Sequence, residues 1–316
     1  MAFKYDSEIQ VLLSNMAQES LESPILQRGD WKALRELANV GYENLASLVT
    51  PVPNDVTKKS FFLTTEDGAS IELRWYTKTG TNPGSAVVYA HGGGLVGGSL
   101  DLYDPFVSQY VTLSGVPFLA VEYRLAGENK GIILAEDTYA AIAWLFEHAS
   151  ELGIDCNRIA VMGDSGGGAP AAGAAILARN RGIQLSKQIL IYPMLDDRNI
   201  NPDPHMGPFA SWTYDNNYTG WYALLGDDIA GDNVSSIAAP ARNTNFEGLA
   251  PAYIEVGELD IFRDEDVDYA KKLWKAGISV ELHVHPGATH GFERFAPSTQ
   301  VARRAMADRI RVLQSL

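Results

Sequence analysis

Apolar residues recur with a helical period over the first fifty positions. Ser7 and Gln10 have the spacing of a capping box at the start of a first helix. The apolar face of this helix contains Ile9, Leu12, Leu13 and Met16. Asp30 is placed to cap a second helix, whose apolar stripe contains Trp31, Leu34, Ala38 and Leu45. Both helices therefore need a surface against which to bury these stripes.

The apolar period changes to two after position 60. Two runs at 61–63 and 71–75 flank Asp67-Gly68, a dipeptide typical of tight turns between antiparallel strands. This pattern predicts a β-hairpin.

Six short apolar runs then alternate with longer amphipathic stretches. The runs occupy 86–90, 117–121, 158–162, 188–192, 252–256 and 279–284. Several are apolar throughout, as strands buried on both faces must be. The stretches at 135–151, 263–276 and 299–313 are long enough to be crossover helices. We therefore expect an α/β protein with a mostly parallel central sheet flanked by helices.

The region 195–245 breaks this alternation and is interpreted as an insertion. Its aromatic residues crowd a short span: Phe209, Trp212, Tyr214, Tyr218, Trp221 and Tyr222. They form either the insertion's own small core or a wall that faces the substrate.

Charge and cysteine content narrow the function classes. The chain has 316 residues, with 25 Lys and Arg against 39 Asp and Glu, and this net charge of −14 disfavours nucleic acid and anionic lipid as partners. No run approaches the ~18 apolar residues of a membrane span. The first eight residues have neither a basic region followed by an apolar run nor a cleavage site, so we expect no signal peptide. The lone Cys156 cannot form an intramolecular disulfide. We expect a cytoplasmic protein without a membrane span.

The strongest chemical signal is the sequence Gly-Asp-Ser-Gly-Gly at 163–167. It directly follows the strand predicted at 158–162 and precedes a helical run at 169–178. A serine in such a strand-to-helix turn exposes its hydroxyl at the carboxyl edge of the sheet. Ser165 is therefore the candidate nucleophile, and the alternative is a glycine-rich turn that contains an incidental serine.

A serine nucleophile requires a base, which must follow it in the chain order of this motif. His290 lies in a loop just past the strand predicted at 279–284, so it is the base we predict. His283 and His285 alternate on that strand and suggest a metal pair. No third ligand stands at a convincing spacing, so we expect no metal there.

The acid that orients the base should lie in a loop at the same edge of the sheet. Asp260 follows the strand predicted at 252–256 and is the residue we predict, with Glu258 and Asp264 as competitors. The alternative role for any of these carboxylates is to cap the next helix.

Acyl transfer also needs N–H donors for the developing oxyanion. Gly92 and Gly93 follow the strand predicted at 86–90, and together with the N–H of Gly166 they would form the oxyanion hole. The same loop matches a dinucleotide fingerprint, with Glu122 as the ribose-binding acid, but that alternative leaves Ser165 and its partners unexplained.

Five motifs together resemble the hormone-sensitive-lipase-like esterases, also called bacterial family IV, of the α/β-hydrolase superfamily. They are His-Gly-Gly-Gly at 91–94, Glu-Tyr-Arg-Leu-Ala at 122–126, Gly-Asp-Ser-Gly-Gly-Gly at 163–168, Asp-Ile-Phe-Arg-Asp-Glu at 260–265 and His-Gly-Phe at 290–292. The resemblance implies an α/β-hydrolase fold, a Ser165-Asp260-His290 triad and an oxyanion hole formed by Gly92, Gly93 and Gly166.

The resemblance also implies a cap over the pocket. Residues 1–55 would form its N-terminal helical segment, and 195–245 would be a cap insertion in a catalytic domain at 56–316. Substrate contacts are expected from Leu95, Asp164, Phe209, Trp212 and Tyr214.

Two positions depart from the family pattern. Gly166 stands where alanine is usual, which is expected to loosen the turn, and Gly-Glu-Asn-Lys-Gly at 127–131 replaces a proline-containing stretch at the pocket edge. These departures bear on substrate preference and leave the reaction unchanged.

The predicted function is a serine carboxylesterase for short- to medium-chain esters, with a small-molecule ester substrate and no cofactor. Amidase, deacetylase or formamidase activity with the same triad is an alternative, as is a non-catalytic small-molecule receptor. A homodimer is possible, because similar proteins commonly pair through their last strand and helix.

Overall fold

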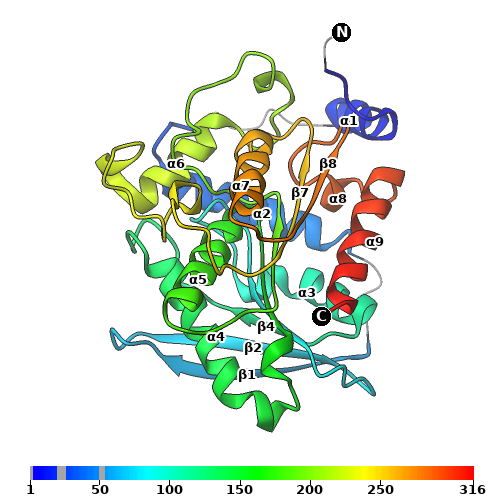
Figure 1. Ribbon diagram of the computed structural model, residues 1–316. Coiled ribbons are helices and arrows are strands. Elements are labelled where there is room, and N and C mark those ends of the chain that lie inside the picture. The colour runs from blue at the N-terminus through cyan, green and yellow to red at the C-terminus, as the bar shows by residue number, and fades with distance from the viewer. Residues whose placement is uncertain (1–2, 20–25, 50–53) are drawn as a thin grey trace.

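The computed structural model describes residues 3–19, 26–49 and 54–316 of the chain. Its centre is an eight-stranded sheet in the order β1-β2-β4-β3-β5-β6-β7-β8 (Figure 1). The strands are β1 Val56–Thr64, β2 Ser70–Lys78, β3 Ala86–Ala90, β4 Phe118–Val121, β5 Ile159–Asp164, β6 Lys187–Ile191, β7 Ala252–Gly257 and β8 Val280–His285. The hairpin β1–β2 is antiparallel and β2 pairs antiparallel with β4, whereas all other neighbours are parallel. The mostly parallel sheet predicted from the apolar runs is confirmed.

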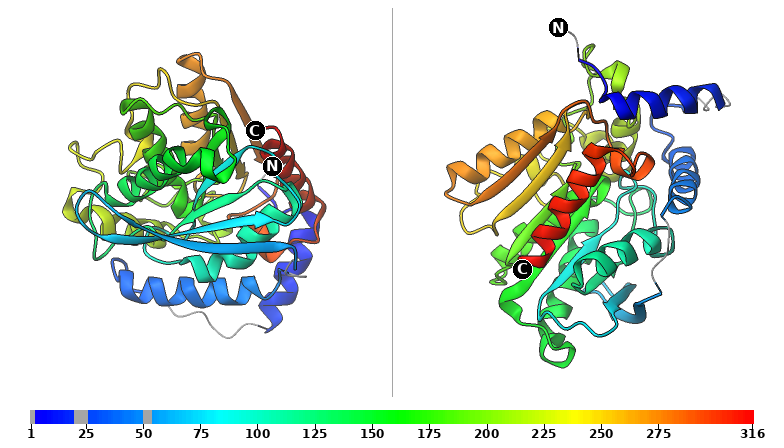
Figure 2. Two further views of the ribbon diagram at one scale, coloured as in Figure 1. Left: turned by 90° about the horizontal axis from the view of Figure 1, so that it is seen from below. Right: turned by 90° about the vertical axis from the view of Figure 1, so that its right-hand side faces the viewer.

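Helices cover both faces of the sheet. They are α1 Ser7–Glu19, α2 Trp31–Ala46, α3 Leu100–Ser114, α4 Ile133–Leu152, α5 Gly168–Asn180, α6 Tyr214–Leu225, α7 Arg263–Lys275, α8 Phe292–Phe295 and α9 Gln300–Gln314. Figure 2 shows α4, α5 and α7 on one face and α3 with α9 on the other. Strands β3 to β6 are almost entirely buried between them, which explains why their sequences lack polar alternation.

The two segments predicted to form the cap contact each other above the carboxyl ends of the parallel strands. Helix α2 packs on α6, and the Gly29 N–H donates to Thr219 Oγ1 over 2.9 Å. Between Leu195 and Asn245 the described chain forms α6 and short 3₁₀ turns but no strand. No helix in the described segments combines the length and apolar character needed to cross a bilayer.

The structure differs from the sequence analysis at two helices. The cap of α1 is Asp6 and not Ser7, because Asp6 Oδ1 accepts the N–H groups of Glu8 at 2.9 Å and Ile9 at 3.3 Å. The sequence patterns also missed α3, which contains Pro105, a residue that argues against a helix interior. Asp30 caps α2 as predicted, by accepting the N–H of Ala33. The side chain of Met16, predicted on the apolar face of α1, is outside what the structure describes.

Candidate active site

Ser165 lies at a sharp turn between β5 and α5. Its φ of 53° is in the left-handed region, which is unusual for a non-glycine residue and is typical of a strained strand-to-helix turn. The glycines around it allow close backbone contacts, since a Cβ at Gly167 would collide with the carbonyl oxygens of Ala90 and His91. This turn places Ser165 at the carboxyl edge of the sheet.

Three loops bring Ser165, His290 and Asp260 together. Ser165 Oγ lies 2.8 Å from His290 Nε2, and His290 Nδ1 lies 2.7 Å from Asp260 Oδ2. Asp260 is 1% exposed and Ser165 is 5% exposed, so the chain of contacts is shielded from water. A hydroxyl, an imidazole and a carboxylate are thus arranged in the hydrogen-bonded order that nucleophilic catalysis requires.

The structure distinguishes among the three candidate acids. Only Asp260 contacts His290 among them; its other oxygen, Oδ1, accepts the N–H of Phe262 over 3.0 Å. Glu258 accepts the N–H of Gly287, and Asp264 is exposed and pairs with Arg263. The triad and helix-terminus roles considered for Asp260 are therefore compatible, because each uses a different oxygen.

Two aromatic rings hold the His290 imidazole edge-on. Tyr192 lies with its ring centroid 4.7 Å away at an interplanar angle of 66°, and Phe262 lies 5.2 Å away at 85°. Tyr192 follows β6 with a φ of 37°. Sequence reasoning assigned no site role to Tyr192, although its position at the carboxyl end of a buried parallel strand was an available signal.

The glycine loop after β3 lies directly against the serine turn. No acceptor among the described groups receives the N–H of Gly92 or Gly93, so both donors remain available. His91 at the start of the loop is buried, which lowers its pKa, and its neutral ring contacts the Gly92 carbonyl oxygen through Nδ1 at 2.9 Å. Glu122, the residue considered for ribose binding, accepts the N–H of Leu100 instead.

The glycine loop approaches the backbone of Gly166 closely. A Cβ at this position would lie 2.5 Å from the Gly94 nitrogen and 2.6 Å from the Leu95 nitrogen. The glycine loop thus fills the space that an alanine side chain would need, and the expectation that Gly166 loosens the turn stays a prediction.

A buried ion pair holds Asp164, the residue that precedes Ser165. Asp164 Oδ2 accepts from Arg294 Nη2 over 2.7 Å and from the Tyr103 hydroxyl over 3.2 Å, while Oδ1 accepts from the Tyr89 hydroxyl. Burial and the Asp164 carboxylate raise the pKa of both tyrosines, so each stays a donor. Asp164 is thus engaged on both oxygens. Sequence reasoning did not find Arg294, because nothing local to 290–294 indicates its partner.

A cleft of about 290 Å³ opens over Ser165 and His290. One wall is α2, through Leu34, Leu37, Ala38, Gly41, Tyr42 and Leu45. The opposite side contains Asp164, Tyr192, Ser211, Trp212, Asn216, Gly291, Arg294 and Phe295. The cleft is therefore largely apolar, with a few polar groups near the serine.

Three of the five predicted substrate contacts do not line this cleft. Leu95 is fully buried, Tyr214 is 7% exposed at the start of α6, and Phe209 packs its ring on Tyr5 at 5.0 Å. Leu95 and Tyr214 are buried among core side chains and Phe209 packs on Tyr5, so none of the three lines the cleft. Trp212 and Asp164 do line the cleft.

The loop at 127–131, whose sequence departs from the family pattern, contacts both segments of the predicted cap. Glu128 pairs with Arg35 of α2 at 2.6 Å, and Lys130 Nζ donates to the Ala223 carbonyl oxygen of α6 at 2.6 Å. The Gly127 N–H also donates to Ala223. This loop is not among the cleft-lining residues, so its effect on the pocket edge is indirect.

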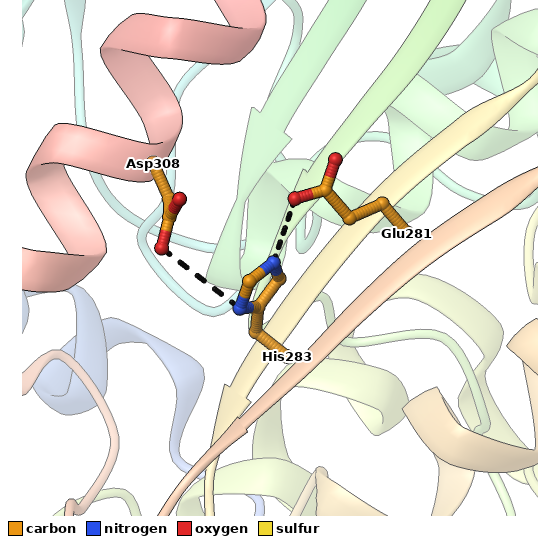
Figure 3. A group of neighbouring side chains, drawn as sticks. All are labelled: Glu281, His283 and Asp308. Atoms are coloured by element: carbon orange, nitrogen blue, oxygen red, sulfur yellow. Dashed lines mark hydrogen bonds and ion pairs between the residues drawn. The ribbon is translucent and has the colours of Figure 1, made fainter.

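His283 has two carboxylates beside it, as Figure 3 shows. Glu281 lies 2.8 Å from Nε2, whereas Asp308 from α9 lies 3.9 Å from Nδ1. Metal ligands must converge on one point, but these carboxylates approach opposite ring nitrogens, and Arg311 contacts both of them. The geometry favours an ion-pair cluster at the edge strand, and Asp308 is a neighbour that strand spacing alone could not reveal.

Comparison with known proteins shows which family the chain resembles. A family model described as the alpha/beta hydrolase fold matches residues 87–294. The chain is 34% identical to ethyl acetate hydrolase of Pseudomonas putida over 257 residues, 80% of each chain. It is 37% identical to carboxylesterase NlhH of Mycobacterium tuberculosis over 226 residues, 69% of this chain and 70% of that one. The solved structure of a bacterial heroin esterase superposes with a TM-score of 0.87 at 32% identity, covering 99% of this chain and 98% of that one.

The chain belongs to the α/β-hydrolase fold family, in its hormone-sensitive-lipase-like branch of esterases. It is a carboxylic ester hydrolase. The fold and the family expected from the sequence motifs are thereby confirmed.

Proposed function

We propose that this enzyme hydrolyses short- to medium-chain carboxylic esters through Ser165, His290 and Asp260. The observation that carries the proposal is the continuous contact from Ser165 Oγ through His290 to Asp260, at 2.8 Å and 2.7 Å. The relative that acts on ethyl acetate supports small esters as substrates. The cleft of about 290 Å³ is near the lower end of ~300–1,000 Å³ for ligand pockets, which favours short acyl groups.

In the proposed mechanism, His290 Nε2 accepts the Ser165 proton while Oγ attacks the ester carbonyl carbon. Asp260 accepts from His290 Nδ1 and stabilises the imidazolium that forms. The N–H groups of Gly92, Gly93 and Gly166 donate to the carbonyl oxygen as it becomes negative. His290 then protonates the leaving alkoxide, which leaves an ester between Ser165 and the acyl group.

Deacylation repeats these steps with water as the nucleophile. His290 accepts a proton from water, the hydroxide attacks the acyl carbon, and the proton returns to Ser165 as the carboxylic acid leaves. Tyr192 and Phe262 keep the imidazole in place through both halves, because their rings pack against its edges.

Hydrolysis of p-nitrophenyl esters from acetate to palmitate tests this proposal. We expect kcat/KM to be highest for the short and medium esters and to fall at least about tenfold by palmitate, because a long acyl chain exceeds the cleft. A flat profile would contradict the chain-length proposal. An anilide with the same acyl group as the best ester measures how fast the enzyme hydrolyses an amide relative to an ester.

Variants of the triad test the assignment of roles. Ser165→Ala should lower kcat by something on the order of 10⁶-fold, and Asp260→Asn by up to about 10⁴-fold. Asp264→Asn is the matched control, because its exposed side chain pairs only with Arg263. Near-normal turnover by Asp260→Asn, or no reaction of Ser165 with a fluorophosphonate, would overturn the triad.

A further inference from the structure

The ring of Tyr192 connects His290 to a buried group of charged side chains. Its centroid lies 4.7 Å from that of the His290 imidazole, in an edge-on arrangement. Its hydroxyl donates to Glu293 Oε1 over 2.5 Å and accepts from Arg294 Nε over 3.3 Å. Burial raises the pKa of Tyr192 well above its usual value, so the hydroxyl keeps its proton. The side chain is therefore fixed by its backbone at one end and by these hydrogen bonds at the other.

Glu293, on α8, accepts this tyrosine hydroxyl as a carboxylate. Burial opposes its ionisation, but Arg309 and Arg294 outweigh burial and lower the pKa of Glu293 to about 2. From α9, Arg309 Nη1 donates to the same Oε1 over 2.9 Å. Arg309 Nε donates to Glu255 Oε1 over 2.7 Å, and Glu255 lies on β7, the strand that precedes Asp260. Glu293 is thereby fixed relative to the strand that leads to the predicted acid.

Glu293 and Arg309 do not contact the groups proposed to react. Tyr192 lines the cleft over Ser165, but Glu293 and Arg309 are not among its lining residues. Within the described part of the chain, the side chain of Glu293 forms no hydrogen bond with His290. An effect of Glu293 on the reaction is therefore expected to pass through Tyr192, which contacts both residues.

We propose that Glu293 is a positioning residue for His290, which acts by holding the Tyr192 hydroxyl. This rests on the proposed roles of Ser165 and His290. A general base must lie within hydrogen-bonding distance of the proton it accepts, and His290 Nε2 lies 2.8 Å from Ser165 Oγ. Without the carboxylate, the tyrosine ring can turn about its side-chain bonds, and the imidazole that it packs against loses alignment. A displacement of ~1 Å can cost about 10²-fold in rate.

Replacement of Glu293 by methionine tests this role, because methionine is unbranched like glutamate but its sulfur is only a weak acceptor. Arg309 keeps Glu255 and Arg294 keeps Asp164, so neither guanidinium loses its last carboxylate. We expect Glu293→Met to lower kcat about tenfold and to change KM less than about twofold, because the side chain lies outside the cleft. Glu293→Gln retains a carbonyl oxygen for the hydroxyl and should restore most of kcat. A glutamine variant as slow as the methionine variant would overturn the proposal.

The Tyr192→Phe variant separates this role from a general loss of packing, because it removes only the hydroxyl. Its kcat should fall by a similar factor, and the addition of Glu293→Met should then lower kcat no further. If the two losses multiply in the double variant, or if Tyr192→Phe has a normal kcat, the proposal is overturned. Tyr192→Phe decides the question even if Glu293→Met does not fold.

A buried carboxylate on α4 provides the matched control. Asp137 is buried and pairs with Arg124, which also pairs with Asp67, so Asp137→Leu likewise leaves its guanidinium a partner. Asp137 does not line the cleft, so its variant should keep kcat even if its melting temperature falls. An equal loss of kcat in Asp137→Leu would overturn the proposal.

Each kcat is referred to the amount of Ser165 that a fluorophosphonate labels to completion. This separates the two possible failures. A parent enzyme in which Ser165 is not labelled would overturn the triad, and the role of Glu293 with it. Complete labelling with an unchanged kcat in Glu293→Met would overturn the role of Glu293 alone.

Discussion

Gly166 shows how one missing methyl group determines the geometry of the site. Its Cα faces the nitrogens of Gly94 and Leu95, and the Trp212 indole covers Gly94 from the other side, where a Cβ would collide with it. The loop that carries the proposed oxyanion donors is therefore held between the serine turn and the insertion. Any side chain at 166 must move this loop.

We predict that Gly166→Ala lowers kcat with little change in the amount of folded protein. A displaced oxyanion donor costs up to ~10²–10³-fold in kcat, and the added Cβ pushes on the loop that provides the donors. The measurement is kcat on a short p-nitrophenyl ester. Gly207→Ala is the control, because a Cβ there meets no atom within 4 Å. Equal kcat values for the two variants would show that the glycine loop can move to accommodate the added methyl group without loss of activity, and would contradict the prediction.

At the scale of elements, the N-terminal segment braces the loop that carries His290. The Asp6 N–H donates to the Gly287 carbonyl oxygen at 2.9 Å, and Ile9 packs in a small core with Ala288 and Phe292. Figure 2 shows α1 lying across α8 and the end of β8. The loop is thus packed from outside by residues nearly the whole chain length away.

Gly287→Ala should therefore lower both thermal stability and kcat. Gly287 has a φ of 68°, and a Cβ there would collide with the Asp6 nitrogen. Gly277→Ala is the matched control, since its φ of 77° is similar but a Cβ meets nothing within 4 Å. Both variants carry a strain of ~1–3 kcal/mol from the left-handed backbone. Only the additional loss of stability and of kcat in Gly287→Ala, relative to Gly277→Ala, therefore reports the contact with Asp6. Identical melting temperatures and kcat values in the two variants would refute this bracing role.

Helix α7 carries a buried carboxyl group in its first turn. Asp266 is fully buried, and neither of its oxygens has a hydrogen-bond partner among the described residues. Burial, with Glu265 and Asp260 nearby, raises the pKa of Asp266 well above its usual value. The folded protein thus keeps this proton at a pH where the unfolded chain has lost it.

This raised pKa predicts a pH-dependent effect of Asp266→Asn. From about pH 4 upward the unfolded state binds fewer protons than the folded state, so the free energy of unfolding falls as pH rises toward the folded pKa, by at most about 1.4 kcal/mol per pH unit. Asparagine removes this loss, so the variant should gain stability relative to the parent as pH rises. Urea unfolding at about pH 5 and about pH 7.5 measures the difference in the free energy of unfolding between variant and parent. Asp268→Asn, at an exposed position, is the control. A difference that does not change with pH would contradict the prediction.

For the whole molecule, the net charge of −14 acts on substrates before they reach the cleft. An ester that carries a carboxylate is repelled, and salt screens this repulsion because the Debye length shortens from about 30 Å at 0.01 M to about 10 Å at 0.1 M. We predict that the ratio of kcat/KM for such an ester to that for a neutral ester rises a few-fold over this range. A constant ratio would show that the surface charge does not act at the cleft. The homodimer stays a prediction, which sizing chromatography would test.

Much of the site was predictable because its signals are local. The serine turn, the glycine loop and the positions of Asp260 and His290 after strands all depend on backbone geometry within a few residues and on chain order. The apolar period likewise identified the sheet, since strands buried on both faces leave a continuous apolar run.

Other features became visible only in the tertiary structure. The wall formed by α2, the engagement of Asp164 by Arg294, the packing of Tyr192 on His290 and the placement of Phe209 and Tyr214 away from the cleft all join segments far apart in the chain. Periodicity says which face of an element is buried but not which partner covers it. The sequence by itself therefore determined the fold class and the residues able to carry the chemistry, whereas packing between distant segments decided the shape of the cleft.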